Sequence, residues 1–496
     1  MIQRSVDPPV LEHGAIVDTD YALLIGGAWQ SAASGAAFSV TNPATGERLA
    51  GVPDAGSAET QSAIDAAAVA LPGWAATPAP VRAALLRKVA TLMLERQERL
   101  ATIMTLEQGK PLAEARGEIA YAASFLAWFA GEGERVYGQT IPASLPNKRL
   151  LVLRQPVGVV ALITPWNFPA AMLTRKLGPA LAAGCTAVCK PAEQTPLSAL
   201  ELGRLFVEAG FPPGVVNIIT TRDPVAFADT IFADDRVRKV SFTGSTEVGK
   251  ELIRKSAEGV KRLSLELGGN APFIVFNDAD FDAAVKGAVA SKFRNTGQTC
   301  VCANRIFVQR GIYERFATAF TAEVAALKVG NGLDPETKIG PLIDAQALEK
   351  VRWHVGDAVA QGAEVLIGGG PYDLGHRAGH FWTPTVLAQA TPAMLVAREE
   401  TFGPVAPLIA FDSEEEVIRM ANASPYGLAA YFYTRDVSRV IRVAEALEYG
   451  IVGANDALPS TAQAPFGGFK QSGLGREGGP IGIDEYLEMK FVSLGI

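Results

Sequence analysis

Residues 157–163 are apolar from end to end, and this run constrains the fold more than any other segment. Thr164 and Pro165 stop it. A strand with one face in water alternates apolar and polar residues, whereas a strand buried on both faces of a parallel sheet is apolar throughout. The run therefore predicts a parallel sheet that helices cover on both faces.

A short strand followed by a helix recurs along the chain. Helices are predicted at 57–70, 81–107, 171–183 and 197–209, and strands at 186–190, 215–219 and 239–242. A second region of strands and helices runs from about 266 to 449. This alternation is typical of an α/β fold whose ligand crevice lies at the carboxyl ends of the strands.

The composition excludes some classes of partner. The chain has 496 residues, enough for two or three domains, since single cores stop growing near about 250 to 300 residues. Its 45 basic and 52 acidic side chains give a net charge of −7, without a dense run of Lys and Arg. Nucleic acid and anionic membranes are therefore not expected partners.

The cysteine content and the N-terminal sequence indicate a compartment. Four cysteines are too few for a disulfide framework in so long a chain. The first twenty residues match neither a signal peptide nor an Arg-rich transit peptide, and no apolar stretch approaches the ~18 residues of a membrane span. We therefore expect a cytoplasmic protein.

One cysteine and one glutamate are candidates for a nucleophile and its base. Cys300 follows a Gly-Gln-Thr turn, and Glu266 lies at a predicted strand end before Gly268 and Gly269. A free thiol titrates near about 8.5, so it needs a base to react at neutral pH, and Glu266 is suited to that task. A buried inert cysteine and a solvated glutamate are the alternatives that the residues leave open.

Two further motifs suggest ligand binding. The strand at 239–242 runs into Gly244 and Ser245 and then into a helical pattern, an arrangement that suits a pyrophosphate. Asn167 lies between two prolines, where its amide either stabilises an oxyanion or caps the following helix. Residues 473–478 match the dinucleotide glycine pattern, but they lack a preceding strand and a following βαβ unit, so we interpret that match as false.

No metal is expected. The four histidines, at 13, 354, 376 and 380, lie away in sequence from these motifs. The chain has no His-Glu-x-x-His, and Cys185 and Cys189 lack a second ligand pair at zinc spacing.

Taken in order, the motifs resemble those of the aldehyde dehydrogenases, which oxidise aldehydes with NAD or NADP. The resemblance covers nearly the whole chain, from residue 42 to residue 477. It is carried by PWNFP at 165–169, KPAEQTP at 190–196, FTGSTEVG at 242–249, ELGG at 266–269, GQTC at 297–300, ETFGP at 400–404 and PFGG at 465–468.

The resemblance implies a role for each motif. Cys300 is the implied nucleophile and Glu266 the general base, and Asn167 with the Cys300 backbone N–H forms an oxyanion hole. The implied cofactor-binding residues are Trp166, Lys190, Glu193, Gly244, Ser245 and Glu400, and Glu477 is a further carboxylate near the site. Glu193 favours NAD, because a carboxylate accepts hydrogen bonds from both ribose hydroxyls and repels a 2′-phosphate, although NADP remains possible.

The implied substrate is an aldehyde that carries a carboxylate. Arg175, Arg294 and Ser460 resemble the anionic pocket of succinate-semialdehyde dehydrogenases, since forked guanidinium groups suit a carboxylate. The alternative is two ordinary salt-bridged arginines. Pro459 departs from the family pattern, so glutarate semialdehyde and 2-oxoglutarate semialdehyde stay open, as does a general aldehyde dehydrogenase. A thiol esterase and a catalytically silent relative are the alternatives outside this chemistry.

Cys302 is two residues from Cys300, so in an extended segment the two side chains share a face. A reducible disulfide between them would switch the enzyme off, and some succinate-semialdehyde dehydrogenases are regulated in this way. A small packed residue is the alternative reading.

The family resemblance also implies the domain organisation. We expect an N-terminal tail at 1–20, a Rossmann-like NAD(P)-binding domain at 21–137 and 158–265, and a second α/β catalytic domain at 266–450. Residues 451–477 would form an active-site loop that returns to the cofactor domain. A small β arm at 138–157 and 478–496 would join copies into a homodimer or homotetramer.

Overall fold

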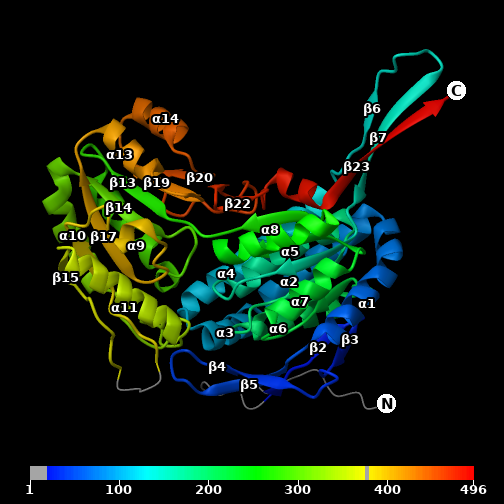
Figure 1. The fold of residues 1–496 in the computed structure, drawn as a ribbon, viewed down its shortest axis with the longest axis horizontal. Helices are drawn as coiled ribbons and strands as arrows, with labels where there is room; N and C mark the ends of the chain where they lie inside the picture. Colours follow the sequence, from blue (N-terminus) through cyan, green and yellow to red (C-terminus); the bar gives the residue numbers. More distant parts are fainter. Residues whose placement is uncertain (1–18, 375–378) are drawn as a thin grey trace.

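The computed structural model describes residues 19–374 and 379–496. Figure 1 shows two layered α/β bodies side by side, with a β arm that projects from one of them. Each body is built on a largely parallel sheet, which confirms the predicted α/β class. Residues 1–18 of the predicted N-terminal tail lie outside the described residues, whereas Thr19–Asp20 forms β1, paired with β5 (Arg48–Pro53).

The first sheet has a parallel centre and antiparallel edges. Its eight strands are, in spatial order, β22 (Gly473–Leu474), β12 (Arg262–Glu266), β11 (Val237–Thr243), β8 (Val159–Ile163), β9 (Thr186–Lys190), β10 (Val216–Ile218), β2 (Leu23–Ile25) and β3 (Ala28–Gln30). Helices cover it: α1 (Ser57–Ala76), α2 (Ala79–Glu95), α3 (Gln97–Gln108), α4 (Leu112–Gly133), α5 (Pro169–Ala183), α6 (Pro196–Ala209), α7 (Pro224–Ala233) and α8 (Thr246–Gly259).

Strand β8 is buried on both faces, as its sequence predicts. Val159 and Ala161 pack in a core with residues of α1 and α7. Val160 and Leu162 point the other way, into a core with residues of α5 and α6. Successive side chains of a strand alternate between faces, so a strand between two helical layers needs apolar residues at every position.

The predicted helix at 81–107 is wrong as a single helix. It is two helices, α2 and α3, which meet at Arg96, where φ is −109° and ψ is 20°. Neither Gly nor Pro marks the break in the sequence. The bend lets both helices pack against α4 and α6, so tertiary packing overrides the continuous helical pattern.

The second sheet lies in the other body. Its seven strands are, in spatial order, β15 (Glu364–Ile367), β16 (Thr385–Ala388), β17 (Val405–Phe411), β14 (Ala303–Gln309), β13 (Ala271–Val275), β19 (Ala429–Tyr433) and β20 (Ile451–Ala454). The helices of this body are α9 (Phe281–Phe293), α10 (Tyr313–Ala325), α11 (Ala345–Ala360), α12 (Leu395–Arg398), α13 (Glu414–Asn422) and α14 (Val437–Ala446). Residues 451–454 were expected in the return segment, but they pair in parallel with β19 and so extend this sheet.

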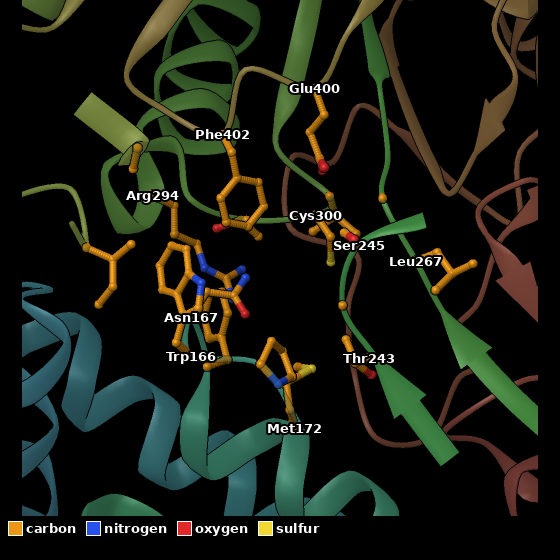
Figure 2. A pocket seen from close by; sticks show the side chains of 18 of the residues that line it. Trp166, Asn167, Met172, Thr243, Ser245, Leu267, Arg294, Cys300, Glu400 and Phe402 are labelled. Atoms are coloured by element: carbon orange, nitrogen blue, oxygen red, sulfur yellow. The ribbon is translucent and has the colours of Figure 1, made fainter. Parts of the chain in front are cut away.

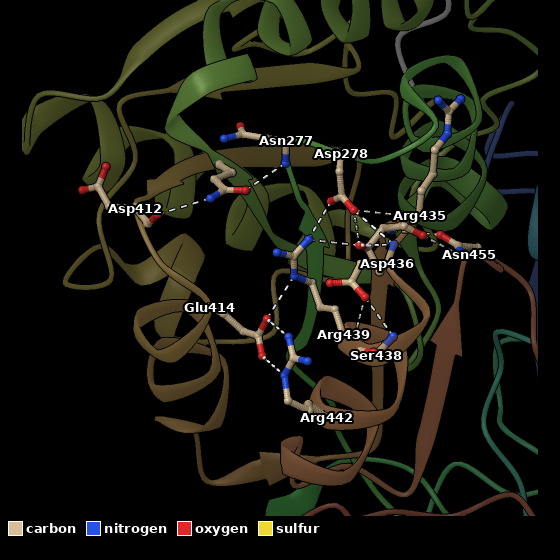
Figure 3. Close-up of polar contacts among 12 residues, drawn as sticks. Asn277, Asp278, Asp412, Glu414, Arg435, Asp436, Ser438, Arg439, Arg442 and Asn455 are labelled. Atoms are coloured by element: carbon tan, nitrogen blue, oxygen red, sulfur yellow. Dashed lines mark hydrogen bonds and ion pairs between the residues drawn. The ribbon is translucent and has the colours of Figure 1, made fainter.

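Charged side chains tie two outer helices to the second sheet (Figure 3). Arg439 on α14 donates to Asp278 Oδ1 at 2.7 Å and to Glu414 Oε2 at 3.0 Å. Arg442 donates to the same Glu414 carboxylate at 2.9 Å. The network joins α13, α14 and the loop after β13 on the outside of the body.

A three-stranded sheet forms the projecting arm (Figure 1). It contains β6 (Gln139–Ile141), β7 (Lys148–Pro156) and β23 (Leu487–Gly495), with β7 in the middle. Between β20 and β23 the chain returns to the first body, where β22 pairs with β12. Within residues 19–374 and 379–496, no helix is both long and apolar enough to span a membrane.

Candidate active site

A cavity of about 460 Å³ opens where segments of the two bodies meet. The segments that follow β8, β11 and β12 contribute to it, together with the loop that precedes β14. Figure 2 shows the side chains of Asn167, Cys300 and Glu400 directed into this space. Of the predicted site residues, the lining contains Trp166, Asn167, Arg175, Gly244, Ser245, Arg294, Cys300, Glu400 and Ser460. Glu266, Lys190, Glu193 and Cys302 lie outside the lining.

The loop before Cys300 has an unusual backbone. Asn295 and Thr296 are buried and have φ values of 50° and 58°, and Gly297 follows with a φ of 75°. Non-glycine residues with such φ values are uncommon and cost free energy, so the surrounding contacts must stabilise them. This backbone turns the chain sharply, and the turn places Cys300 at the wall of the cavity.

The amide of Asn167 connects the two loops of the site. The side-chain Nδ2 of Asn167 donates to the carbonyl oxygen of Gln298 at 3.1 Å, and the backbone carbonyl oxygen of Asn167 accepts from Asn295 Nδ2 at 3.0 Å. The N-cap residue of helix α5 is Phe168, and the N–H groups at the helix start donate to Glu118 and not to Asn167, so the alternative of a capping asparagine is wrong. The amide has a second N–H to offer, close to the predicted nucleophile.

Burial keeps the Cys300 thiol protonated. It raises the pKa of Cys300 to about 12, and the Glu400 carboxylate adds to the rise, whereas Arg175 opposes it. At neutral pH this cysteine is therefore a thiol, and its reaction as a nucleophile requires a base.

Glu266 has the properties of such a base. It ends β12, is buried, and its Oε2 atom has no hydrogen-bond partner among the described residues. Burial, and then the Glu477 carboxylate, raise the pKa of Glu266 well above its ordinary value. A carboxylate with a raised pKa is a stronger base near neutral pH than one in water.

Two buried pairs at this site were not predicted from the sequence. Lys176 on α5 forms an ion pair with Glu477 and donates to Ser241 Oγ at 3.1 Å. Lys110 pairs with Glu118 at 2.5 Å and donates to the Asn167 carbonyl at 2.7 Å. Each lysine lies far in sequence from at least one partner, so spacing gave no signal for either contact.

Glu118 also links the pair to helix α5. Its Oε1 atom accepts from the N–H groups of Ala170 and Ala171 at 3.0 and 3.2 Å. Because these donors are unpaired at a helix start, the carboxylate satisfies them and fixes where α5 begins. The same pair therefore holds both Asn167 and the helix that carries Arg175.

The glycine turn after β11 has the features of a phosphate site. A methyl group on Gly244 would lie 2.3 Å from the ring of Phe242, so only glycine fits. Ser245 caps α8 by accepting from the Val248 N–H at 3.3 Å. A glycine turn at a helix N-terminus favours an anion such as a pyrophosphate.

Lys190 and Glu193 lie at the carboxyl end of β9. Lys190 is buried, and its Nζ lies 3.4 Å from Glu193 Oε2, whose side chain is 40% exposed. Lys190 also donates to the Pro191 carbonyl at 3.2 Å. An exposed carboxylate beside an ammonium offers both an acceptor and a donor to the hydroxyls of a ribose.

Glu400 faces the cavity from the second body. Its Oε1 accepts from the Gly269 N–H at 3.1 Å, and burial raises its pKa to about 7. Phe402, two residues further on, has a φ of 56° and packs edge-on against Trp166 at 5.5 Å. Glu400 and Phe402 thus add a polar and an aromatic side chain to the cavity wall.

The two predicted substrate arginines have different surroundings. Arg175 is 2% exposed and forms a buried ion pair with Glu477, as the salt-bridged alternative expects, with its Nη1 3.7 Å from Glu477 Oε2. Its Nε and Nη1 atoms have no hydrogen-bond partner among the described residues. The Arg294 guanidinium lies 4.8 Å from the Phe168 ring centroid and makes no hydrogen bond or ion pair within the described part of the chain. Buried donors without partners are rare, which points to a ligand that supplies the acceptor.

Cys302 lies behind the cavity wall. All four cysteines are free thiols. The Cys302 Sγ lies 3.6 Å from the Lys292 carbonyl oxygen and 3.9 Å from that of Arg294, in the interior. Its pairing with Cys300 stays a prediction. In the described residues, no group of three or more His, Cys, Asp or Glu could hold a metal ion.

Comparisons with known proteins agree with this geometry. The chain is 57% identical over 473 residues to the succinate-semialdehyde dehydrogenase (NADP(+)) of Escherichia coli strain K12, covering 95% of this chain and 97% of that protein. It is 57% identical over 472 residues to the glutarate-semialdehyde dehydrogenase of Pseudomonas putida strain KT2440, with the same coverage of 95% and 97%.

A solved structure shares the fold over nearly the whole chain. The crystal structure of succinate-semialdehyde dehydrogenase from Burkholderia pseudomallei is 56% identical, covers 96% of this chain and 98% of its own, and has a TM-score of 0.94. The model of the Aldehyde dehydrogenase family matches residues 29–492. The chain therefore belongs to the aldehyde dehydrogenase family.

Proposed function

We propose that this enzyme uses NAD(P) to oxidise a semialdehyde that carries a distal carboxylate, most simply succinate semialdehyde to succinate. The observation that carries the proposal is Arg175, which lines the cavity and whose buried Nε and Nη1 atoms have no hydrogen-bond partner among the described residues. Buried guanidinium donors that make no hydrogen bond are costly, and a substrate carboxylate would accept hydrogen bonds from them. Relatives named succinate-semialdehyde and glutarate-semialdehyde dehydrogenases support the same substrate class.

The chemistry that we propose begins at Cys300. Glu266 removes the thiol proton, directly or through water, and the thiolate adds to the aldehyde carbon. The Asn167 amide and the Cys300 N–H stabilise the oxyanion, and removing one such donor elsewhere costs about 10²- to 10³-fold in rate. Loss of hydride, which a bound nicotinamide would accept, leaves a thioester on Cys300. Once the thiol proton has passed from Glu266 to solvent, Glu266 deprotonates the water that hydrolyses the thioester, which releases the carboxylate product and the Cys300 sulfur.

The cofactor site fits NAD(P). The glycine turn at Gly244 and Ser245 would hold the pyrophosphate, Lys190 and Glu193 the adenosine ribose, Trp166 the approach of the cofactor, and Glu400 the nicotinamide ribose. When bound, the nicotinamide supplies the hydride acceptor. We propose that NAD is preferred, because the Glu193 carboxylate would repel a 2′-phosphate.

The experiment that tests this function compares succinate semialdehyde, glutarate semialdehyde and butanal, followed at 340 nm with each nucleotide. We expect selectivity for the anionic aldehydes over butanal to fall at least tenfold in Arg175→Ala, since hydrogen bonds to charged groups contribute about 1.5 to 3 kcal/mol. Arg352→Ala, at an exposed site on α11, is the matched control. Equal use of butanal by the wild type would leave a general aldehyde dehydrogenase and remove the substrate assignment.

A thiol esterase would use the same Cys300 and Glu266 without a nucleotide. The cofactor-site features at Gly244, Ser245 and Glu400 favour the dehydrogenase over the esterase. Turnover of esters that does not depend on nucleotide, at rates matching aldehyde oxidation, would favour the esterase instead.

We also propose that copies of the chain assemble through the β arm, as a homodimer or homotetramer. Leu153, Met489, Phe491 and Leu494 on β7 and β23 are exposed apolar residues. Exposed apolar patches of this kind are typical of interaction surfaces.

Four free thiols fit a reducing compartment, which supports a cytoplasmic location.

A further inference from the structure

Tyr121 on helix α4 shares the cavity wall with Arg175. Its hydroxyl oxygen accepts a hydrogen bond from Arg175 Nη2 at 2.8 Å. The rings of Phe125 and Phe466 flank the same guanidinium, with centroids 4.9 and 4.1 Å from its Cζ. Tyr121 is therefore the hydrogen-bonded support of an arginine that aromatic rings otherwise surround.

This arrangement leaves donors unused. A tyrosine hydroxyl can accept hydrogen bonds and donate one. Within the described part of the chain, no group accepts a hydrogen bond from the Tyr121 hydroxyl, whose only hydrogen bond is the one from Arg175. Arg175 Nη2 donates to Tyr121, whereas Nε and Nη1 have no hydrogen-bond partner among the described residues. One hydroxyl and one guanidinium thus present free donors side by side.

The surroundings contain a limited supply of acceptors for these donors. Glu477 Oε2 is 3.7 Å from Arg175 Nη1, and the other oxygen of that carboxylate pairs with Lys176. The Phe125 and Phe466 rings that flank the Arg175 guanidinium offer no strong acceptor. An anion in the cavity would satisfy the free donors.

We propose that Tyr121 is a substrate-binding residue, whose hydroxyl donates to the distal carboxylate of the aldehyde while it orients Arg175 toward the same group. The inference rests on the proposed function and adds a residue to the anionic pocket. It gives the site a neutral donor in addition to the charged Arg175 and Arg294. A neutral donor on a helix fixes where the carboxylate lies, whereas an arginine adds attraction over a longer range.

Tyr121→Phe tests the assignment, because it removes the hydroxyl and keeps the ring. The quantity to measure is selectivity, the ratio of kcat/KM for succinate semialdehyde to kcat/KM for butanal. We expect the ratio to fall about tenfold or more, because hydrogen bonds to charged groups are stronger than those between neutral groups. The change should come mainly from a higher KM for the anionic aldehyde. The inhibition constant of succinate should rise by a similar factor. Tyr137→Phe, on an exposed tyrosine, is the matched control, and thermal unfolding checks that both variants fold.

A double-mutant cycle separates direct binding from support of Arg175. If Tyr121 only orients the arginine, Tyr121→Phe has no further effect on selectivity in an Arg175→Ala background. If its hydroxyl touches the carboxylate, selectivity falls at least threefold more in that background. Absence of that further loss would overturn direct binding, as would unchanged selectivity in the single variant.

The outcomes distinguish this inference from the proposed function. A wild type without preference for the anionic aldehyde would overturn both. A preference that Arg175→Ala removes and Tyr121→Phe leaves intact would overturn the role of Tyr121 alone.

Discussion

A methyl group on Gly297 would lie 2.2 Å from the carbonyl oxygen of Gly403. The loop that carries Cys300 and the loop that carries Glu400 therefore touch backbone to backbone. Gly297 also has a φ of 75°, in the left-handed region where glycine is favoured. Close contact and left-handed backbone together make this position specific for glycine.

We expect Gly297→Ala to lower kcat at least tenfold and to lower the melting temperature, because the added methyl group forces the two loops apart. Gly35→Ala is a matched control, since Gly35 has a φ of 71° and open space around its Cα. Steady-state kinetics and thermal unfolding of both variants check the prediction. Equal losses in both would mean that backbone strain, and not the contact with Gly403, accounts for the effect.

The pKa of Glu400 predicts how cofactor binding depends on pH. Burial raises this pKa to about 7, so the side chain is neutral below that pH and ionised above it. An ionised carboxylate is the stronger acceptor for ribose hydroxyls. We therefore expect the KM for NAD to fall as the pH rises from 6 to 8, and Glu400→Gln to lack this change. A wild-type KM that is constant across the range contradicts the prediction.

The negative charge of Glu193 leads to a prediction about the preference of the enzyme between NAD and NADP. Replacement by Gln removes the negative charge and keeps the size of the side chain. We expect kcat/KM for NADP to rise at least tenfold relative to NAD in Glu193→Gln, because a 2′-phosphate no longer meets a like charge. Glu251→Gln, on the exposed surface of α8, is the control. An unchanged ratio would assign the preference to other residues.

Cys302 predicts a response to oxidants. If it pairs with Cys300, peroxide inactivates the wild type reversibly, whereas in Cys302→Ala the loss is no longer recovered by dithiothreitol. In the structure, the Cys302 sulfur lies 3.6 Å from the Lys292 carbonyl oxygen, whereas Cys300 lines the cavity. Identical inactivation and recovery in both proteins would exclude the switch.

The β arm predicts the effect of one charge on assembly. Phe491 is 60% exposed on β23, so Phe491→Asp would bury a charge in the proposed interface. We expect light scattering to show smaller assemblies for this variant. Val69→Asp, at an 84% exposed position on α1, is the control and should keep the wild-type mass. Wild-type mass in both variants would place the interface elsewhere.

The pattern of apolar residues, Gly and Pro along the chain predicted those strands and helices whose ends are set by nearby residues. Thr186–Lys190 was predicted with its observed bounds, because Pro191 ends an apolar run. Arg96 was missed, since only the packing of α2 and α3 on their neighbours produces that bend. The family resemblance brought Asn167, Cys300 and Glu400 together, and the structure places all three at one cavity.

Contacts between distant residues had no sequence signal. Nothing in the order of residues places Lys110 against the Asn167 carbonyl or Tyr121 against Arg175. Both contacts depend on where α4 packs against α5. Tertiary packing, and not spacing along the chain, therefore determines which polar groups surround the predicted nucleophile.

Strand β22 lies near the C-terminal end of the chain, so it joins the first sheet late in synthesis. The site is therefore completed late as well. A ribosome releases Asn167, Glu266 and Cys300 long before Glu477, which pairs with Lys176. Until β22 has emerged, the edge of β12 has no partner on that side. A nascent chain thus carries Cys300 without the complete site while residues 301–477 are being synthesised.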